Sequence, residues 1–176
     1  MKNCLVIIDV QNGFLSDRTE HVPVRLQQLL RGKHNFDHVV ATQFKNVDGG
    51  PYTELMGWYG LLSEDSQKLH PFVSACSEKV FVKNIYSCFT REFELYLEEQ
   101  GIDKLYFAGI DTDCCVLMSA ADCFERNIPF EVLLYYCASN GGPASHEAAI
   151  LVMERTIGRN LMRKEKLCGA AEEDFE

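Results

Sequence analysis

The sequence predicts an α/β fold in which three layers enclose a doubly wound, mostly parallel β-sheet. Short apolar runs rich in β-branched residues alternate with longer amphipathic stretches, and this alternation continues over most of the 176 residues. Parallel neighbours in a sheet require crossover connections, which the amphipathic stretches supply as helices on both faces. We therefore expect a Rossmann-like sheet of six strands, for which the usual strand order is 3-2-1-4-5-6.

The expected strands are continuous apolar runs, a pattern typical of strands that are buried on both faces. The clearest of them lie at residues 5–9, 39–42, 80–82, 105–110 and 130–134. A sixth strand is expected within residues 160–167.

Helices are expected between these strands, where apolar residues recur at the three-and-four spacing of an amphipathic helix. They lie at residues 24–30, 90–100, 115–126 and 145–157. Residues 44–68 fit neither pattern and contain several glycines, a proline and Trp58. A segment of this length and composition favours a functional surface loop over a linker.

Composition indicates one domain over residues 1–169, because 47% hydrophobic residues can form a large core. The net charge of −9 includes four acids in residues 170–176, which we expect to be a disordered acidic tail. This charge argues against nucleic-acid binding, and the chain has no apolar run long enough for a membrane span. Most of the eight cysteines lie in apolar segments, so we expect reduced thiols and a cytoplasmic protein.

Chemistry is expected at the carboxyl ends of the strands, where open α/β sheets bind their ligands. Asp9, Lys83 and the pair Cys114 and Cys115 occupy three such ends. A thiol with a pKa of about 8.5 becomes a good nucleophile when a base takes its proton or a cation stabilises the thiolate. Cys115 would also open the helix after the fourth strand, where free N–H groups favour an oxyanion.

Each of these residues also has a structural interpretation. An Asp after a strand is commonly a turn former, a Lys is usually a surface residue, and a Cys is often a small buried hydrophobe. The joint occurrence of the three at strand ends favours a catalytic set, but the residue types alone leave open which cysteine is the nucleophile.

Residues 109–116, Gly-Ile-Asp-Thr-Asp-Cys-Cys-Val, resemble the nucleophile motif Gly-x-x-Thr-Asp-x-Cys-Val of the isochorismatase-like cysteine hydrolases. Three further segments, at residues 7–12, 83–89 and 137–148, resemble other family segments and follow the family's order. The resemblance covers nearly the whole chain. It implies a catalytic triad of Asp9, Lys83 and Cys115, with the second cysteine of the pair as the nucleophile.

The resemblance also implies the local geometry of the site. The peptide bond between Ile110 and Asp111 would be cis, and the backbone N–H groups of Asp111 and Cys115 would form the oxyanion hole. Cys114 would occupy a variable position and pack away from the pocket. Asp9 would take the proton of Cys115, the thiolate would attack a carbonyl group, and water would release the acid from a thioester.

One departure from the family pattern concerns metal binding. Nicotinamidases of this superfamily carry an Asp-x-His motif and a second His after the second strand, but residues 42–51 contain no His. Asp48 alone would not hold a transition metal. We therefore expect an enzyme without a metal or other cofactor, and nicotinamide is a disfavoured substrate.

Cys115 favours cleavage of a small-molecule amide or a related C–N bond. Two alternatives remain: vinyl-ether hydrolysis of the isochorismatase type, which needs no thiol, and a non-catalytic binding or assembly protein that retains the triad. Relatives usually form dimers or tetramers, so we expect a homo-oligomer. Tyr135 and Tyr136 stand where many relatives carry an Asp, and they would shape the pocket or a subunit contact.

Aromatic residues near the predicted strand ends are the candidates for the wall of a substrate pocket. Such a wall suits a small, flat or partly apolar substrate. The six candidates are Phe14, Phe44, Tyr52, Trp58, Tyr86 and Phe89.

Overall fold

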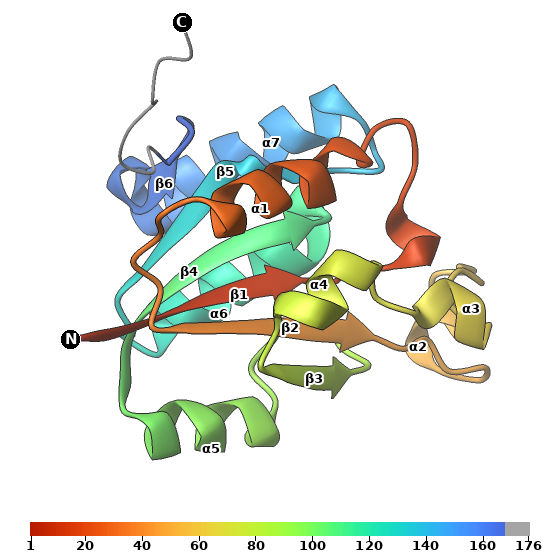
Figure 1. Cartoon of the computed structure of the whole chain (residues 1–176). Helices are drawn as coiled ribbons and strands as arrows, with labels where there is room; N and C mark the ends of the chain where they lie inside the picture. Colours follow the sequence, from red (N-terminus) through yellow and green to blue (C-terminus); the bar gives the residue numbers. More distant parts are fainter. Residues whose placement is uncertain (168–176) are drawn as a thin grey trace, which may run out of the picture.

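Six parallel strands form a single sheet in a computed structural model that describes residues 1–167 (Figure 1). The strand order is β3-β2-β1-β4-β5-β6, which confirms the predicted fold class and order. The strands are β1 (Lys2–Ile8), β2 (His38–Phe44), β3 (Lys79–Lys83), β4 (Ile102–Ile110), β5 (Phe130–Ala138) and β6 (Met162–Arg163). The acidic tail expected at residues 170–176 lies outside the described residues.

Most strands extend beyond the apolar runs that predicted them, because pairing with the neighbouring strands continues past those runs. β1 begins at Lys2, and β5 continues to Ala138. β6 is much shorter than the segment in which it was expected, and it pairs only with Val132 and Leu133 of β5.

Helices cover both faces of the sheet. They are α1 (His21–Arg31), α2 (Pro51–Glu54), α3 (Glu64–Gln67), α4 (Pro71–Cys76), α5 (Arg91–Gln100), α6 (Leu117–Glu125) and α7 (Pro143–Met153). Buried residues of α1 and α4 belong to one apolar core, and those of α5, α6 and α7 belong to another. The alternation of strand side chains separates the cores, since Val6 and Ile8 face the second while Leu5 and Ile7 face the first.

The helix predicted at residues 115–126 begins differently from the expectation. A π-helical turn, Thr112–Val116, precedes α6, so Cys115 lies within the turn and does not open the helix. The N–H groups of Cys114 and Val116 both donate to the carbonyl oxygen of Asp111, at 3.1 Å and 3.1 Å, and the second bond closes the wider π-type ring.

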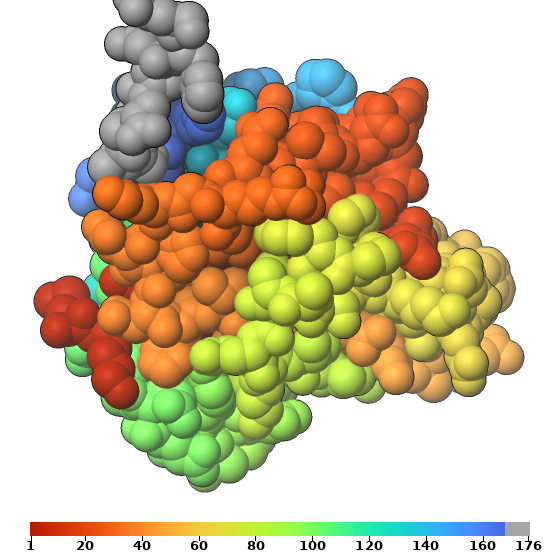
Figure 2. All heavy atoms as spheres, in the orientation of Figure 1, coloured from red at the N-terminus to blue at the C-terminus, as the bar shows by residue number. Residues whose placement is uncertain are grey.

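The segment of residues 44–68 contains the short helices α2 and α3 between irregular stretches. In Figure 2 this segment forms a compact lobe at the end of the molecule toward which the strands of Figure 1 point. Its position beside the carboxyl ends of the strands places it over the expected site.

None of the helices within residues 1–167 is long and apolar enough to cross a membrane.

Candidate active site

Asp9 follows the last residue of β1 and is held in a constrained conformation. Its φ angle of 50° lies in the left-handed region, which residues other than glycine rarely adopt and which often marks a functional position. The side chain is completely buried. Thr42, near the end of β2, donates its hydroxyl to Asp9 Oδ1 at 2.7 Å and accepts the Asp9 N–H at 3.3 Å. Thr42 therefore fixes both the backbone and the carboxylate of Asp9.

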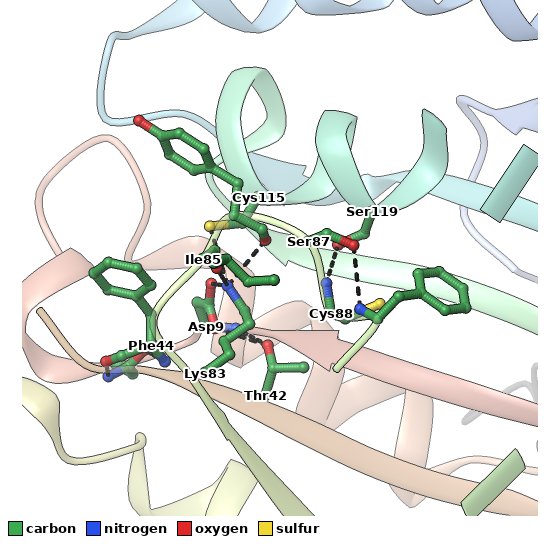
Figure 3. A network of polar contacts seen from close by, with 12 residues as sticks. Asp9, Thr42, Phe44, Lys83, Ile85, Ser87, Cys88, Cys115 and Ser119 are labelled. Atoms are coloured by element: carbon green, nitrogen blue, oxygen red, sulfur yellow. Dashed lines mark hydrogen bonds and ion pairs between the residues drawn. The ribbon is translucent and has the colours of Figure 1, made fainter. Parts of the chain in front are cut away.

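Lys83 ends β3 and forms a buried ion pair with Asp9. Its Nζ atom lies 2.7 Å from Asp9 Oδ2, and it donates to the carbonyl oxygens of Ile85 and Tyr86 at 3.0 Å and 3.0 Å (Figure 3). Burial alone would lower the pKa of Lys83, but the negative charge of Asp9 and the hydrogen bond to its carboxylate outweigh burial, so the pKa is raised. Lys83 is therefore a protonated ammonium group at neutral pH.

Cys115 lies against this pair. Its Sγ atom is 3.4 Å from Lys83 Nζ, and the residue is only 3% exposed (Figure 3). Burial and then the charge of Asp9 raise the pKa of the thiol well above its usual value, although Lys83 acts in the opposite direction. Cys115 is thus a protonated thiol in the resting protein. Of the two routes of activation considered above, the surroundings favour proton transfer to Asp9 over a resting thiolate.

Gly109 explains how the end of β4 comes close enough to β1 for Cys115 to lie near Asp9. Its φ angle of 135° is accessible to glycine, and a Cβ atom at this position would overlap the backbone of Ile8. The missing side chain lets the end of β4 approach the end of β1, so the turn that carries Cys115 comes close to Asp9.

A cavity of about 290 Å³ opens beside Cys115. Five of the six predicted aromatic residues line it, namely Phe14, Phe44, Tyr52, Trp58 and Tyr86. The rings of Phe14 and Trp58 stack with centroids 6.0 Å apart, and Tyr52 meets Tyr86 edge-on at 5.1 Å. The aromatic wall comes from the 44–68 segment and from the loops that follow β1 and β3.

Two expectations about this cavity were wrong. Phe89 is not a wall residue, because it is 6% exposed and packs against Phe93 in the core beneath α5. Cys114 was expected to pack away from the pocket, but it lines the cavity beside Cys115. The π-helical turn explains this placement, because successive side chains diverge by a smaller angle there than in an α-helix.

Gln11 is a positioning residue that the sequence analysis did not single out. Its amide group donates to the carbonyl oxygens of Phe44 and Gln67, at 2.8 Å and 2.7 Å, and accepts the Phe44 N–H at 2.8 Å. These bonds join the end of β1 to the end of β2 and to the 44–68 segment. The available signal was the position of Gln11 within residues 7–12, which resemble a segment of the family and contain Asp9-Val10-Gln11.

The side chain of Asp111 is a second feature that sequence analysis missed. The peptide bond between Ile110 and Asp111 is cis, and the side chain of Asp111 lines the cavity. Its Oδ1 atom accepts the backbone N–H of Asn140 at 2.7 Å and the side-chain Nδ2 of Asn140 at 2.9 Å. Asn140 Nδ2 also donates to the carbonyl oxygen of Phe14 at 3.0 Å, so it connects two walls of the cavity.

Asp111→Asn is expected to stabilise the protein above pH 6. Burial raises the pKa of Asp111 to about 6 from 3.8, so the folded state holds this proton more tightly than the unfolded state. Stability therefore falls as the pH rises from about 4 to about 6, by at most about 3 kcal/mol. Asparagine removes the charge but keeps an oxygen for Asn140. Thermal unfolding at pH 4 and at pH 8 measures the effect.

The difference between Asp111→Asn and the wild type should vanish near pH 4, where the carboxyl group of the folded wild type is protonated. Asp48→Asn is the matched control, because it makes the same charge change at an exposed position. A lower melting temperature for Asp111→Asn at pH 8 would contradict the expected cost of ionising this carboxyl group.

The chain belongs to the isochorismatase family. A family model described as the isochorismatase domain matches residues 3–165. The nicotinamidase/pyrazinamidase of Mycobacterium tuberculosis is 26% identical over 182 residues, covering 90% of this chain and 97% of that protein. A nicotinamidase structure from Bacillus subtilis is 27% identical with a TM-score of 0.73, covering 90% of this chain and 97% of the other.

The same fold occurs in an isochorismatase-like hydrolase from Alkaliphilus metalliredigens. Its TM-score is 0.76 at 21% identity, with 89% of this chain and 92% of that chain covered. The family model and the nicotinamidase relatives make this protein an isochorismatase-family hydrolase, and the structural likeness shows its α/β fold.

The residues after β2 do not fit the metal site that this superfamily's nicotinamidases carry there. Gln43 donates to the carbonyl oxygen of Gln67 at 2.8 Å, and Asn46 donates to those of Trp58 and Gly60 at 3.2 Å and 2.9 Å. Within residues 1–167, no three His, Cys, Asp or Glu side chains are grouped so that they could hold a metal. In this isochorismatase-family hydrolase, the two side chains are therefore hydrogen-bonded to backbone carbonyl groups of the 44–68 segment.

Proposed function

We propose that this isochorismatase-family hydrolase cleaves a small-molecule amide or a related C–N bond through a thioester on Cys115. The main support is the contact between Cys115, which lines an aromatic cavity, and Lys83 of the buried Asp9–Lys83 pair. The relatives named nicotinamidase support an amide as the substrate. The buried thiol supports acyl transfer over vinyl-ether hydrolysis, which needs no sulfur nucleophile.

The reaction begins with the resting thiol. As the substrate carbonyl carbon approaches, the Cys115 proton passes to Asp9, the C–S bond forms, and the carbonyl electron pair moves to oxygen. When this pair returns, the C–N bond breaks and the leaving nitrogen takes the proton from Asp9. Water then attacks the thioester and gives a proton to Asp9, and the departing sulfur of Cys115 takes that proton back.

The developing oxyanion requires donors in a water-poor site. We assign this role to the backbone N–H groups of Asp111 and Cys115, which belong to the turn that follows β4. The N–H groups in this turn belong to a continuous helical segment, whose dipole favours negative charge at its start.

Lys83 remains protonated throughout the cycle in this proposal. It is held by Asp9 and by two carbonyl oxygens, so it has little freedom to leave the site. When the proton of Cys115 moves to Asp9, negative charge moves from the carboxylate to the sulfur, and Lys83 lies within reach of both. It therefore balances charge while the proton changes place.

A panel of small amides, ureides and carbamates tests the proposed function by ammonia release from the purified protein. Acid quenching during turnover, followed by peptide mass spectrometry, should show the acyl group of the substrate on Cys115. Release of ammonia without an adduct or burst at Cys115 would contradict the thioester route. Absence of ammonia with every class of compound would contradict the proposed activity.

A further inference from the structure

The charged residues in the cavity wall restrict the charge that a substrate can carry. Asp111 is the only acidic residue that lines the cavity among the described residues, and no Arg, Lys or His lines it. Lys83 lies nearby, but its donors are taken by Asp9 and by two carbonyl oxygens. The cavity therefore offers no free cation to an anionic substrate group, whereas it offers a carboxylate to a positive one.

Asn140 presents the Asp111 carboxylate in a fixed orientation. The backbone N–H and the side-chain Nδ2 of Asn140 both donate to Asp111 Oδ1, while no described residue donates to Asp111 Oδ2. Asp111 is partly exposed and lines the cavity, so Oδ2 is the carboxylate oxygen that remains accessible. One oxygen is thus used to hold the side chain, and the other is available to a bound molecule.

Aromatic rings complete a site for positive charge. The faces of aromatic rings attract cations, Trp most strongly, and the attraction grows when water is excluded. Trp58, Phe14, Tyr52 and Tyr86 line the same cavity as Asp111. A carboxylate combined with several aromatic rings favours an organic cation over a neutral or anionic group of equal size.

We infer that the substrate is an amide that carries a positively charged nitrogen group, such as an ω-amino amide, and that Asp111 selects it. This inference rests on the proposed amide hydrolysis, whose carbonyl would meet Cys115 while the cationic group meets Asp111 Oδ2 and the ring faces. Asp111 is then a specificity-determining residue through its side chain, in addition to the proposed role of its backbone N–H.

Trp58 allows the inference to be tested without turnover. It is the single tryptophan of the sequence, and it lines the cavity, so intrinsic fluorescence reports on ligands there. The probes are n-butylammonium, 1-butanol and butyrate at pH 7.5, which differ mainly in charge. We expect the Kd of butylammonium to be about tenfold lower than that of butanol, and butyrate to bind more weakly than either.

Asp111→Asn should reduce the preference for butylammonium over butanol to less than about twofold, whereas Asp48→Asn should retain it. In the wild type the preference should also weaken as the pH falls below about 6, because Asp111 becomes protonated. Equal binding of the three probes, no fluorescence response to butylammonium, or an unchanged preference in Asp111→Asn would overturn the inference.

Turnover supplies a second test with 4-aminobutanamide and pentanamide, which are similar in length. The wild type should show a kcat/KM for the amino amide about tenfold above that for the neutral amide, mainly through KM. Asp111→Asn should bring the ratio close to one. If the charged probe binds selectively but no amide is cleaved, the proposed function fails while the cationic site stands. If both amides are cleaved equally well, the inference fails while the proposed function stands.

Discussion

Replacing Asp9 by Asn is expected to lower the free energy of unfolding by about 3–5 kcal/mol and to abolish turnover. The variant keeps an oxygen near Thr42 and Lys83 but removes the negative charge, so it leaves the Lys83 ammonium buried without its partner. The loss of stability would be smaller if Lys83 gave up its proton in the variant. Urea unfolding, followed by circular dichroism, measures the change in stability, and ammonia release measures turnover.

The double variant Asp9→Asn/Lys83→Met separates the stability of the pair from its chemistry. Replacing both charged groups removes the uncompensated charge, so the double variant should be more stable than Asp9→Asn alone. It should remain inactive, because no base is left for Cys115. If the two substitutions were instead additive in stability, the ion pair would not be the unit that the 2.7 Å contact indicates.

Cys115→Ala should reduce kcat/KM by about 10³-fold or more while the fold is retained. The substitution removes only a buried sulfur atom, so its cost in stability should be on the order of 1 kcal/mol. Kinetic measurements on an amide that the wild type cleaves provide the test. Cys115→Ser is a useful companion, since its hydroxyl preserves size and polarity but is a weaker nucleophile.

Cys114→Ala is the matched control for the nucleophile. It removes the adjacent thiol from the same cavity wall, yet we expect a loss below about tenfold, because the thiol that Lys83 contacts is that of Cys115. Retained turnover in Cys115→Ala, or an equal loss in Cys114→Ala, would be incompatible with Cys115 as the sole nucleophile.

The sheet could be predicted because its signals are local. Each buried strand is a continuous apolar run, and the crossover rule converts the order of runs and helices into a parallel sheet. The same rule brought Asp9, Lys83 and Cys115 together, since the carboxyl ends of parallel strands share one edge. The resemblance to the family then distinguished Cys115 from Cys114.

The rest of the site depends on contacts between distant parts of the chain. Gln11 is hydrogen-bonded to Phe44 and Asp111 to Asn140, and no local sequence pattern predicts either pair. Whether the side chain of Phe89 enters the core or the pocket could not be predicted either, because an aromatic residue near a strand end is compatible with both positions. The π-helical turn that exposes Cys114 depends on hydrogen bonds to Asp111, which the residue types do not specify.

The strand ends and the 44–68 segment contribute different parts of the site, and this separation affects how the substrate preference of the enzyme could change. Asp9, Lys83 and Cys115 belong to the sheet and to the turn after it, whereas Tyr52, Trp58 and neighbouring wall residues belong to the connection between β2 and β3. Substitutions in that connection can reshape the cavity without moving the residues to which we assign the proton transfer. New substrate preferences are therefore best sought by varying the connection while leaving Gln11 in place, because its bonds anchor the connection to the end of β1 that precedes Asp9.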